Sequence, residues 1–185
     1  MKIIEEFLKQ EQISISLTKM WQDPKRQRLS CLCYLEDKSK LLLLLRNKEP
    51  FADFWTAPGG KIEPGEEPRE AIIREMMEES GLTIINPYLK VITSETGNDS
   101  NYNWLLFIFR CQEYQGSLKE CNEGILDWIP REQLADIKLP DVDRRLSPFI
   151  FDDNKRYFIR LNYNDQHRVD FLRETVIPPL TGKSK

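Results

Sequence analysis

Three glutamates, Glu75, Glu78 and Glu79, stand at positions i, i+3 and i+4 of a segment with helical periodicity. At that spacing their carboxylates project together from one turn of a helix. Like charges so placed destabilise an isolated helix by about 0.2 to 0.5 kcal/mol per pair. Mg²⁺ takes a few carboxylates together with waters and substrate phosphates. The spacing therefore predicts a divalent-cation site, against the alternative of a solvated acidic face balanced by lysines and arginines.

The loop before this segment adds groups that suit a cation site. Gly59 and Gly60 allow the backbone to approach a ligand closely, and a glycine carbonyl can be aimed at a metal. Glu66, near the helix start, can accept a hydrogen bond from Arg74. Residues 61–80 hold seven acids and three bases, whereas the other 165 residues hold 23 acids and 24 bases. One segment supplies the whole negative surplus, which favours a local cation site over a generally acidic protein.

The glutamates need a helix to hold them, and the sequence predicts one from about Glu67 to Ser80. Pro68 suits its first turn and Gly81 its C-terminal cap. Four apolar residues recur at i, i+1, i+4 and i+5, so we expect them to form the face that packs on a sheet: Ile72, Ile73, Met76 and Met77.

The rest of the chain predicts strands with a few helices. A loop is expected over Asn47 to Gly60, a short helix over 131–135 and a second helical segment over 142–151. Apolar runs predict an opening hairpin, three further strands and a closing hairpin around Asn164 and Asp165, at residues 29–35, 40–46, 88–94, 104–111, 125–129, 157–163 and 168–173. The mixture predicts a sheet covered by helices.

Residues 1–27 are expected to form a helical extension ahead of a single domain over residues 28–185. A short amphipathic helix is predicted at the start, and a polar stretch follows it through Pro24. The apolar residues at helical spacing are Ile3, Ile4, Phe7 and Leu8. Packing on its own domain is the favoured role for this helix, with a subunit contact as the alternative.

Composition narrows the class of protein. A chain of 185 residues, 40% hydrophobic and 31% charged, suits one globular domain. The longest aliphatic run, Leu41 to Leu45, is far below the roughly 20 residues that cross a bilayer. Glu5 and Glu6 stand where a signal peptide would be basic. We therefore expect a cytoplasmic protein without a membrane partner, and the lack of a basic stripe predicts no stable nucleic-acid partner.

The cysteines argue against a zinc site. Four of them are scattered without a CxxC pair, and the single histidine, His167, lies far from them in the sequence. This usage favours reduced thiols in the core, which suits a cytoplasm.

Written out, the acidic segment is Gly60, five residues, Glu66, seven residues, and then Arg74-Glu75-Met76-Met77-Glu78-Glu79-Ser80-Gly81-Leu82. This pattern resembles the Nudix box at every defining position, with Met76 and Leu82 in the aliphatic slots. The resemblance covers roughly residues 28 to 175 and implies an α+β fold, the Nudix α/β/α sandwich with a mixed β-sheet between helices. It also implies a hydrolase that cleaves a nucleoside diphosphate linkage by attack of a metal-activated water on phosphorus.

The similarity also implies roles for single residues. Glu78 and Glu79 would be the first metal ligands, the carbonyl of Gly60 a further one, and Glu75 a ligand or the base. The implied cofactor is Mg²⁺, with Mn²⁺ as an alternative. Two more residues of the box would hold loop to helix as supports, namely Glu66 and Arg74.

Members of the MutT type add a glutamate from a later loop. Glu123, in Cys121-Asn122-Glu123-Gly124, stands where that residue would fall and is preferred to Glu120. Arg46, at the end of the second predicted strand, could bind substrate phosphate, and a surface ion pair is its alternative. The residues predicted to bind substrate are Arg46, Trp55, Thr56, Lys61 and Asp141.

Trp55, Pro140-Asp141 and the closing hairpin look like the nucleoside triphosphatases that remove oxidised purine nucleotides, 8-oxo-dGTP among them. The predicted pocket departs from the human enzyme of that group, because Thr56 replaces an asparagine, Leu139 a stacking tryptophan and Val142 a second aspartate. Asp141 keeps its match, and Asp143 is a candidate substitute for the second aspartate. Since base selection depends on paired buried polar groups, these changes argue against 8-oxo-guanine specificity.

The leading prediction is a Mg²⁺-dependent enzyme that cleaves a purine nucleoside triphosphate, oxidised or not, to monophosphate and pyrophosphate. Hydrolysis of ADP-ribose or a dinucleoside polyphosphate is the alternative, and a nucleotide-binding sensor without catalysis is another. ADP-ribose hydrolases of this family usually have a proline some sixteen residues after the box, and none occurs between Pro87 and Pro130. Processing of RNA 5′ ends has no support from the balanced charge. The expected partner is a small nucleotide, and the chain a monomer or homodimer.

Overall fold

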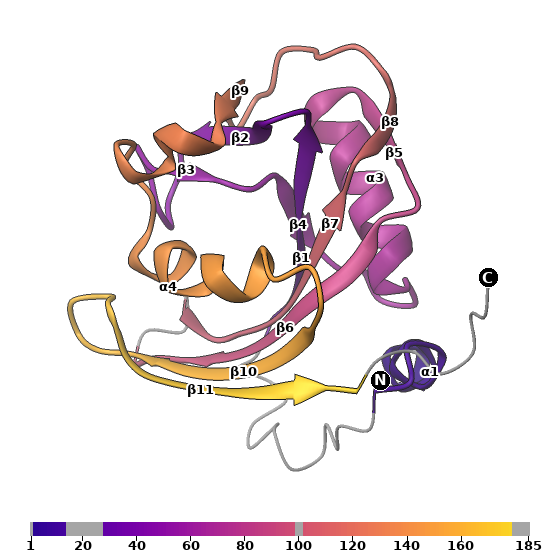
Figure 1. The fold of residues 1–185 in the computed structure, drawn as a ribbon, viewed down its shortest axis with the longest axis vertical. Helices are drawn as coiled ribbons and strands as arrows, with labels where there is room; N and C mark the ends of the chain where they lie inside the picture. Colours follow the sequence, from indigo (N-terminus) through magenta and orange to yellow (C-terminus); the bar gives the residue numbers. More distant parts are fainter. Residues whose placement is uncertain (1, 14–27, 99–101, 179–185) are drawn as a thin grey trace.

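A computed structural model describes residues 2–13, 28–98 and 102–178. Runs of strands are separated by helices, and the chain returns to the same sheet several times (Figure 1). The elements in order are α1 (Lys2–Gln10), β1 (Arg28–Asp37), β2 (Lys40–Arg46), β3 (Trp55–Thr56), β4 (Gly59–Lys61), α3 (Pro68–Ser80), β5 (Leu82–Ile85), β6 (Tyr88–Thr96), β7 (Trp104–Cys111), β8 (Glu113–Gly116), β9 (Gly124–Pro130), the 3₁₀ helix η2 (Arg131–Ala135), α4 (Asp141–Ile150), β10 (Arg156–Tyr163) and β11 (Val169–Ile177).

The large sheet is mixed. Its strand order is β11-β10-β6-β7-β1-β2-β3, with β4 paired to β1 and β9 to β2. Strand β1 runs parallel to β7 and β6 parallel to β10, while β6 and β7 are antiparallel. Strands β5 and β8 form a separate antiparallel pair. The predicted α+β class, a mixed sheet between helices, is confirmed.

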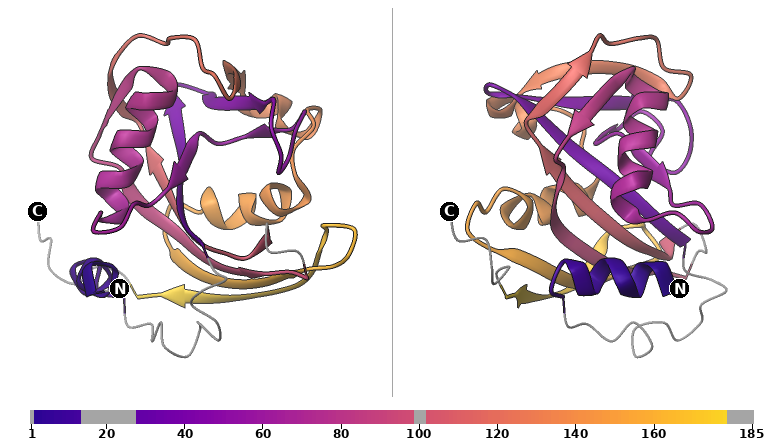
Figure 2. Two further views of the ribbon diagram at one scale, coloured as in Figure 1. Left: turned by 180° about the vertical axis from the view of Figure 1, so that it is seen from behind. Right: turned by 90° about the vertical axis from the view of Figure 1, so that its right-hand side faces the viewer.

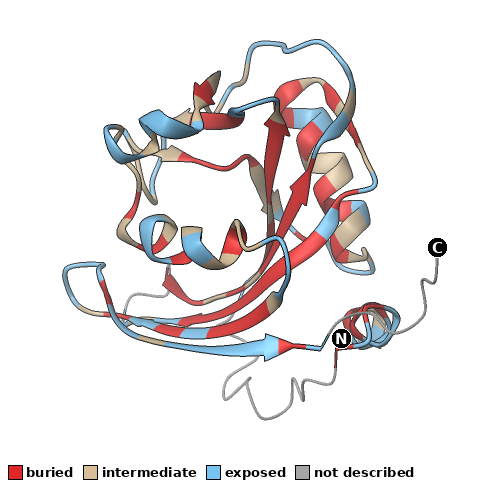
Figure 3. Cartoon of the chain, viewed as in Figure 1, coloured by how far each residue is buried: buried red, intermediate tan, exposed pale blue. Residues whose placement is uncertain are grey.

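The sheet separates two apolar clusters. Side chains alternate along a strand, so Leu105, Phe107 and Phe109 of β7 enter the cluster shared with α1 and α3. Ile108 faces the other way, into the cluster shared with α4. Helix α4 therefore lies on the opposite face of the sheet from α3, as two views of the ribbon show (Figure 2). Buried residues run along the central strands between these layers (Figure 3).

Helix α1 packs on its own domain, as expected. Ile4, Phe7 and Leu8 are buried, and the ring of Phe7 meets Phe107 edge-on with centroids 5.9 Å apart. Just after the helix, the buried Glu11 accepts hydrogen bonds from Arg69 of α3 and from Arg156. Pro24 lies outside the described residues, and the division into an extension over 1–27 and one domain over 28–185 stays a prediction.

Three sequence predictions were wrong in detail. The expected loop over residues 47–60 contains β3, and β4 begins at its end, because both segments pair with the edges of the opening hairpin. Strands β5 and β8 were not foreseen, since each has only four residues. Met77 was expected on the buried face of the helix, but it is 45% exposed. The buried face of α3 instead turns toward Ala71, Ile72 and Met76.

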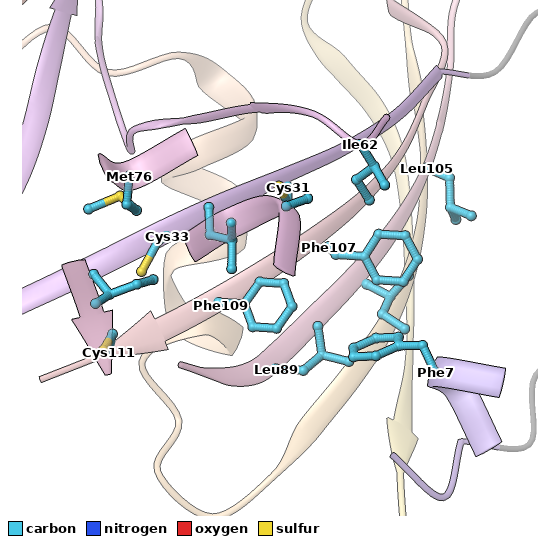
Figure 4. Close-up of a cluster of buried hydrophobic side chains, with 14 of the residues drawn as sticks. Phe7, Cys31, Cys33, Ile62, Met76, Leu89, Leu105, Phe107, Phe109 and Cys111 are labelled. Carbon is cyan, nitrogen blue, oxygen red and sulfur yellow. The ribbon is translucent and has the colours of Figure 1, made fainter. Parts of the chain in front are cut away.

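The cysteines are free thiols, and three of them are buried. Cys31, Cys33 and Cys111 lie in the cluster beneath α3 with the aromatic rings of β7 (Figure 4). The expectation of reduced thiols in the core is confirmed for these three. In the described part of the chain, no helix is long and apolar enough to cross a membrane.

Candidate functional site

A cavity of about 700 Å³ is lined by residues of both α3 and α4, and its β1 and β7 residues Leu32, Leu106 and Ile108 lie on the α4 face of the sheet. Its walls come from both helices, from β1, β4, β6 and β7, and from the segment joining β2 to β3. Four lining glutamates are called here the glutamate cluster: Glu75, Glu78, Glu79 and Glu123. Two further carboxyls, the α4 pair, also line this cavity: Glu95 of β6 and Asp143 of α4.

Local sequence chemistry fixes the helix that carries most of the glutamate cluster. Glu67 caps α3 in a capping box with Glu70, and Pro68 stands in the first turn. Gly81 ends the helix in the left-handed conformation, with φ of 77°. The predicted start and end of this helix are therefore confirmed. Burial of Ile72 and Met76 against the sheet then sets which side of the helix meets the cavity.

Gly60 and Glu75 are in direct contact. A Cβ atom built on Gly60 would lie 2.4 to 2.6 Å from the carboxylate atoms of Glu75, so any side chain at this position would displace that carboxylate. The carbonyl of Gly60 accepts a hydrogen bond from the Ser30 hydroxyl at 2.6 Å. The Cys31 thiol also donates to this carbonyl, with sulfur and oxygen 3.7 Å apart. The glycine thus brings backbone and carboxylate together.

Arg74 organises the carboxylates around it. Its guanidinium donates to both oxygens of Glu66, at 2.8 and 2.9 Å, and this bidentate bond lowers the pKa of Glu66. The same group donates to Glu75 at 2.9 Å and to Glu78 at 3.2 Å. It also donates to the carbonyl of Lys61, so loop and helix are joined. The expected bond from Arg74 to Glu66 is present, and the arginine offsets the repulsion among its neighbours.

Glu79 is the most buried acid of the cluster, at 8% exposure. Its carboxylate accepts a hydrogen bond from the Gly59 amide at 2.9 Å. Burial raises the pKa of Glu79 to about 7, and the charges of Glu123 and Glu75 act in the same direction. Burial also raises the pKa of the half-buried Glu75, although Arg74 opposes it. Glu78, by contrast, has a side chain 60% exposed.

The carboxylates of the cluster line one cavity without surrounding one point. Within residues 2–13, 28–98 and 102–178, no three acidic, histidine or cysteine side chains stand close enough to hold a metal ion. Arg74 holds Glu75 and Glu78, while the Gly59 amide holds Glu79. The single point of convergence that the helical spacing suggested is therefore not found. The donor set itself, four carboxylates beside a backbone carbonyl, fits a hard divalent cation.

Cationic residues rim the same end of the cavity. Arg46 donates to the carbonyl of Pro50 at 3.0 Å and lies 3.9 Å from Glu123. Lys48 lies 3.6 Å from Glu123 as well. Arg46 thus forms the ion pair that was its alternative interpretation and also lines the cavity, whereas its binding of substrate phosphate stays a prediction. Lys61 also lines the cavity, and Glu120 does not.

The other residues predicted to bind substrate differ in whether they line the cavity. Thr56 lines the cavity and is 8% exposed. Trp55, its neighbour, points away because side chains alternate along a strand, and it packs against the cluster beneath α4. Asp141 does not line the cavity either, since its carboxylate accepts hydrogen bonds from the Val169 amide and Arg145. Neither Trp55 nor Asp141 lines this cavity, and their role in substrate binding stays a prediction.

Asp143 lines the cavity where the sequence pointed first to Asp141. Residues two apart on a helix do not share a face, so only one of the two can point inward. Asp143 Oδ1 accepts a hydrogen bond from the Tyr34 hydroxyl at 2.6 Å. The apolar surroundings raise the pKa of Asp143 to about 6. Val142 also lines the cavity, whereas Leu139 does not.

Sequence reasoning missed Glu95, Tyr34 and Tyr163. Glu95 is 3% exposed and lies in a strand otherwise predicted to end at Ser94. A glutamate at the end of an apolar strand normally indicates a solvent-facing position, so the sequence carried no signal of its burial. Only the pairing of β6 between β7 and β10 places it under α4.

Known proteins resemble this chain over most of its length. Residues 24–150 match the model of the NUDIX domain family. The chain is 34% identical over 122 residues to the uncharacterized Nudix hydrolase YvcI of Bacillus subtilis, a match that covers 64% of this chain and 75% of that protein. It is also 39% identical over 62 residues to diphosphoinositol polyphosphate phosphohydrolase 3-beta of Bos taurus, which covers 32% of this chain and only 37% of that protein.

Solved structures show the same fold. A MutT protein from Bacillus halodurans superimposes with a TM-score of 0.71 at 28% identity, over 80% of this chain and 97% of that one. A MutT NUDIX hydrolase from Burkholderia pseudomallei gives a TM-score of 0.59 at 21% identity, over 67% and 98%. The second likeness supports the fold alone.

Proposed function

The chain belongs to the NUDIX domain family, and from that premise we propose that it hydrolyses a purine nucleoside triphosphate to a nucleoside monophosphate and pyrophosphate. Nudix hydrolases act on pyrophosphate bonds of nucleoside diphosphate derivatives, generally with a divalent metal. The proposed substrate is a purine nucleoside triphosphate, which is either normal or oxidised, as in 8-oxo-dGTP. A small nucleotide is then the partner.

The observation behind this proposal is that one cavity has two chemically different ends. One end has carboxylates and basic side chains, and the other has an apolar wall with a few polar groups. Its volume of about 700 Å³ falls within the range of roughly 300 to 1,000 Å³ typical of small-molecule sites. Arg46, Lys48 and Lys61 suit the phosphates. The apolar residues Leu32, Leu106 and Ile108 suit the flat face of a base.

The residues that would hold a divalent cation, Mg²⁺ or Mn²⁺, are Glu75, Glu78, Glu79, Glu123 and the carbonyl of Gly60. When bound, such a cation lowers the pKa of a coordinated water and neutralises charge on phosphate oxygens. Arg74 donates hydrogen bonds to Glu75 and Glu78, and its bond to Glu66 joins the loop to the helix.

Glu75 is our candidate for the group that takes a proton from the attacking water. Burial raises its pKa, while the adjacent Arg74 opposes this shift by favouring the charged form, which is the form that accepts a proton. Contact with Gly60 and the bond from Arg74 fix its position. Because neighbouring carboxylates titrate together, a pH profile will report the cluster rather than one residue.

The experiment is a panel assay with Mg²⁺ that resolves products. The panel contains normal and oxidised purine triphosphates, ADP-ribose, a dinucleoside polyphosphate and a diphosphoinositol polyphosphate. The last compound is included because the relative that is 39% identical over 62 residues is a diphosphoinositol polyphosphate phosphohydrolase. Release of pyrophosphate from a purine triphosphate supports the proposal. Turnover of ADP-ribose alone would replace it, and nucleotide binding without any product would indicate a sensor.

A further inference from the structure

The loop that joins β2 to β3, residues 47–54, contains two strained residues within three positions. Phe51 and Asp53 have left-handed φ angles of 70° and 62°. A bulky residue such as phenylalanine rarely adopts that conformation. The other non-glycine residues with such angles in the described ranges stand alone: Gln12, Lys38, Asn86 and His167. Strained residues persist only where surrounding contacts hold them, and they gather at ligand clamps and switch regions.

Hydrogen bonds to Arg46 hold the base and the middle of this loop. The Arg46 amide donates to the Phe54 carbonyl at 3.0 Å, and the Asp53 amide donates to the Arg46 carbonyl at 2.9 Å. The guanidinium Nε of Arg46 donates to the Pro50 carbonyl at 3.0 Å. The same guanidinium lies 3.9 Å from Glu123 of the glutamate cluster. Arg46 therefore contacts the loop and the glutamate cluster at once.

An aromatic contact holds the tip of the loop. The ring of Phe51 meets the ring of Tyr102, in the segment between β6 and β7, edge-on with centroids 5.7 Å apart. Tyr102 is buried, and its ring also contacts Tyr163 and stacks on His167. Phe51 is only half-buried. An edge-on aromatic pair adds a modest attraction beyond burial, so this contact can hold the loop and still be broken.

The loop forms the part of the cavity wall nearest to Glu123. Lys48, Glu49, Pro50 and Phe51 all line the cavity. The ammonium of Lys48 lies 3.6 Å from the Glu123 carboxylate. A movement of the loop therefore changes the distance between its basic side chain and the glutamate cluster, and it also changes the acceptor that Arg46 holds at Pro50.

We propose that residues 47–54 form a lid over the end of the cavity that holds the glutamate cluster, and that the contact between Phe51 and Tyr102 is its latch. With the latch closed, as in this structure, Arg46 and Lys48 face Glu123. With the latch open, Phe51 is free to leave its strained conformation. Phe51 and Tyr102 are thus positioning residues. The inference rests on the proposed function only in placing phosphate groups at this end of the cavity.

Amide hydrogen exchange tests the latch without turnover. The amides of Asp53 and Phe54 donate hydrogen bonds within the loop, so their exchange reports its opening. Phe51→Leu keeps an apolar side chain but removes the ring, and it should speed the exchange of both amides roughly three- to tenfold. Inorganic pyrophosphate with Mg²⁺ should slow the same exchange in the wild type. Unchanged exchange in Phe51→Leu would overturn the proposal.

Two further variants separate the latch from a general loss of packing. Tyr102→Leu removes the other ring of the latch and should speed the exchange of the loop amides as Phe51→Leu does. Phe149→Leu is the matched control, because its ring meets Tyr157 edge-on at 5.0 Å in the same apolar cluster. The control should leave loop exchange within about twofold of wild type. An equal increase in the control would also overturn the proposal.

Kinetics give a second readout, on the purine triphosphate that the panel assay identifies. Opening the lid removes binding that ground state and transition state share, so the KM for nucleotide and the Ki for pyrophosphate should both rise several-fold in Phe51→Leu, while kcat changes less than about twofold. A fall in kcat at unchanged KM would contradict a lid.

If the wild type cleaves no triphosphate, the proposed function fails by itself, and the exchange experiment still decides the lid. Loop amides of the wild type that exchange at the same rate with and without pyrophosphate and Mg²⁺ would reject it. Slower exchange with pyrophosphate, together with faster exchange in both latch variants, would support it.

Discussion

The glutamate cluster and the α4 pair are both groups of acids on one cavity, and they are stabilised in different ways. Three of the four clustered glutamates lie within one turn of α3, and Arg74 bonds two of those directly. The α4 pair joins distant parts of the sequence and has neutral hydroxyls as its hydrogen-bond donors, from Tyr34, Tyr163 and Thr93. A nearby cation stabilises the charged form of a carboxyl, whereas burial beside neutral groups favours the protonated form.

This difference predicts different effects of substitution. Carboxylates beside an arginine, with a basic rim, suit a site for cations and phosphates. Carboxyls held by hydroxyls against an apolar wall favour the protonated form instead. Substitutions in the cluster should therefore change turnover, and substitutions in the α4 pair should change the pH dependence of stability.

The largest expected effect comes from Glu79→Gln. The amide oxygen of glutamine can still accept from Gly59, but the charge is lost, so kcat should fall by at least about 100-fold with little change in the melting temperature. Pyrophosphate release at saturating nucleotide and Mg²⁺ measures it. Glu70→Gln, on the same helix but in its capping box, is the matched control and should stay within about twofold of wild type. Full activity in Glu79→Gln would contradict a catalytic role for the glutamate cluster.

Gly60→Ala tests whether the close approach of loop and helix matters. The added methyl group must move the Glu75 carboxylate, so we expect kcat to fall roughly 10- to 100-fold. Gly65→Ala is a useful contrast, because its φ of +89° strains the backbone while no atom lies within 4 Å of the new Cβ. It should lower stability and leave kcat nearly unchanged. If the two variants behave alike, the contact with Glu75 has no catalytic role.

Arg74→Lys should give a smaller, mixed effect. Lysine cannot make the bidentate bond to Glu66, so the free energy of unfolding should fall by about 1 to 2 kcal/mol. Turnover should fall several-fold because Glu75 and Glu78 lose a shared donor. Urea titration and steady-state kinetics on the same preparation measure the two effects. Unchanged stability and turnover would show that the arginine does not organise the cluster.

Glu95→Gln should change the pH dependence of stability. Burial raises the pKa of Glu95 from 4.5 to about 7, so the fold favours the protonated acid. The protonated Glu95 therefore makes its full contribution to the free energy of unfolding below about pH 4.5, and this contribution is lost as the pH rises through about 7. The wild type should lose roughly 1 to 3 kcal/mol of stability relative to Glu95→Gln between pH 5 and pH 7.5.

Urea midpoints at several pH values measure this difference. Asp143 titrates in the same range, but it is present in both proteins, so its own contribution largely cancels. Parallel curves for wild type and Glu95→Gln would show that Glu95 stays ionised in the fold. In that case burial beside neutral hydroxyls would not favour the protonated form of Glu95, and the α4 pair would not differ from the glutamate cluster in its protonation.

The sequence by itself determined the helix that carries the glutamates. The spacing of Glu75, Glu78 and Glu79, the proline at the first turn and the glycine at the cap all act within a few residues, so local periodicity was enough. The bond from Arg74 to Glu66 followed in the same way, since Glu66 lies just before α3 and Arg74 stands only eight residues further along the chain. A sheet covered by helices was also foreseen from the apolar runs, whereas its mixed strand directions were expected only from the family resemblance.

Only the tertiary structure decided which groups face the cavity at the α4 end. Rotation of α4 by its packing turned Asp143 inward and Asp141 outward, and the register of β3 turned Thr56 inward and Trp55 outward. Glu95 reached Asp143 because β6 pairs between β7 and β10 beneath that helix. These choices depend on contacts between segments far apart in the chain, and a local pattern of residue types does not contain them.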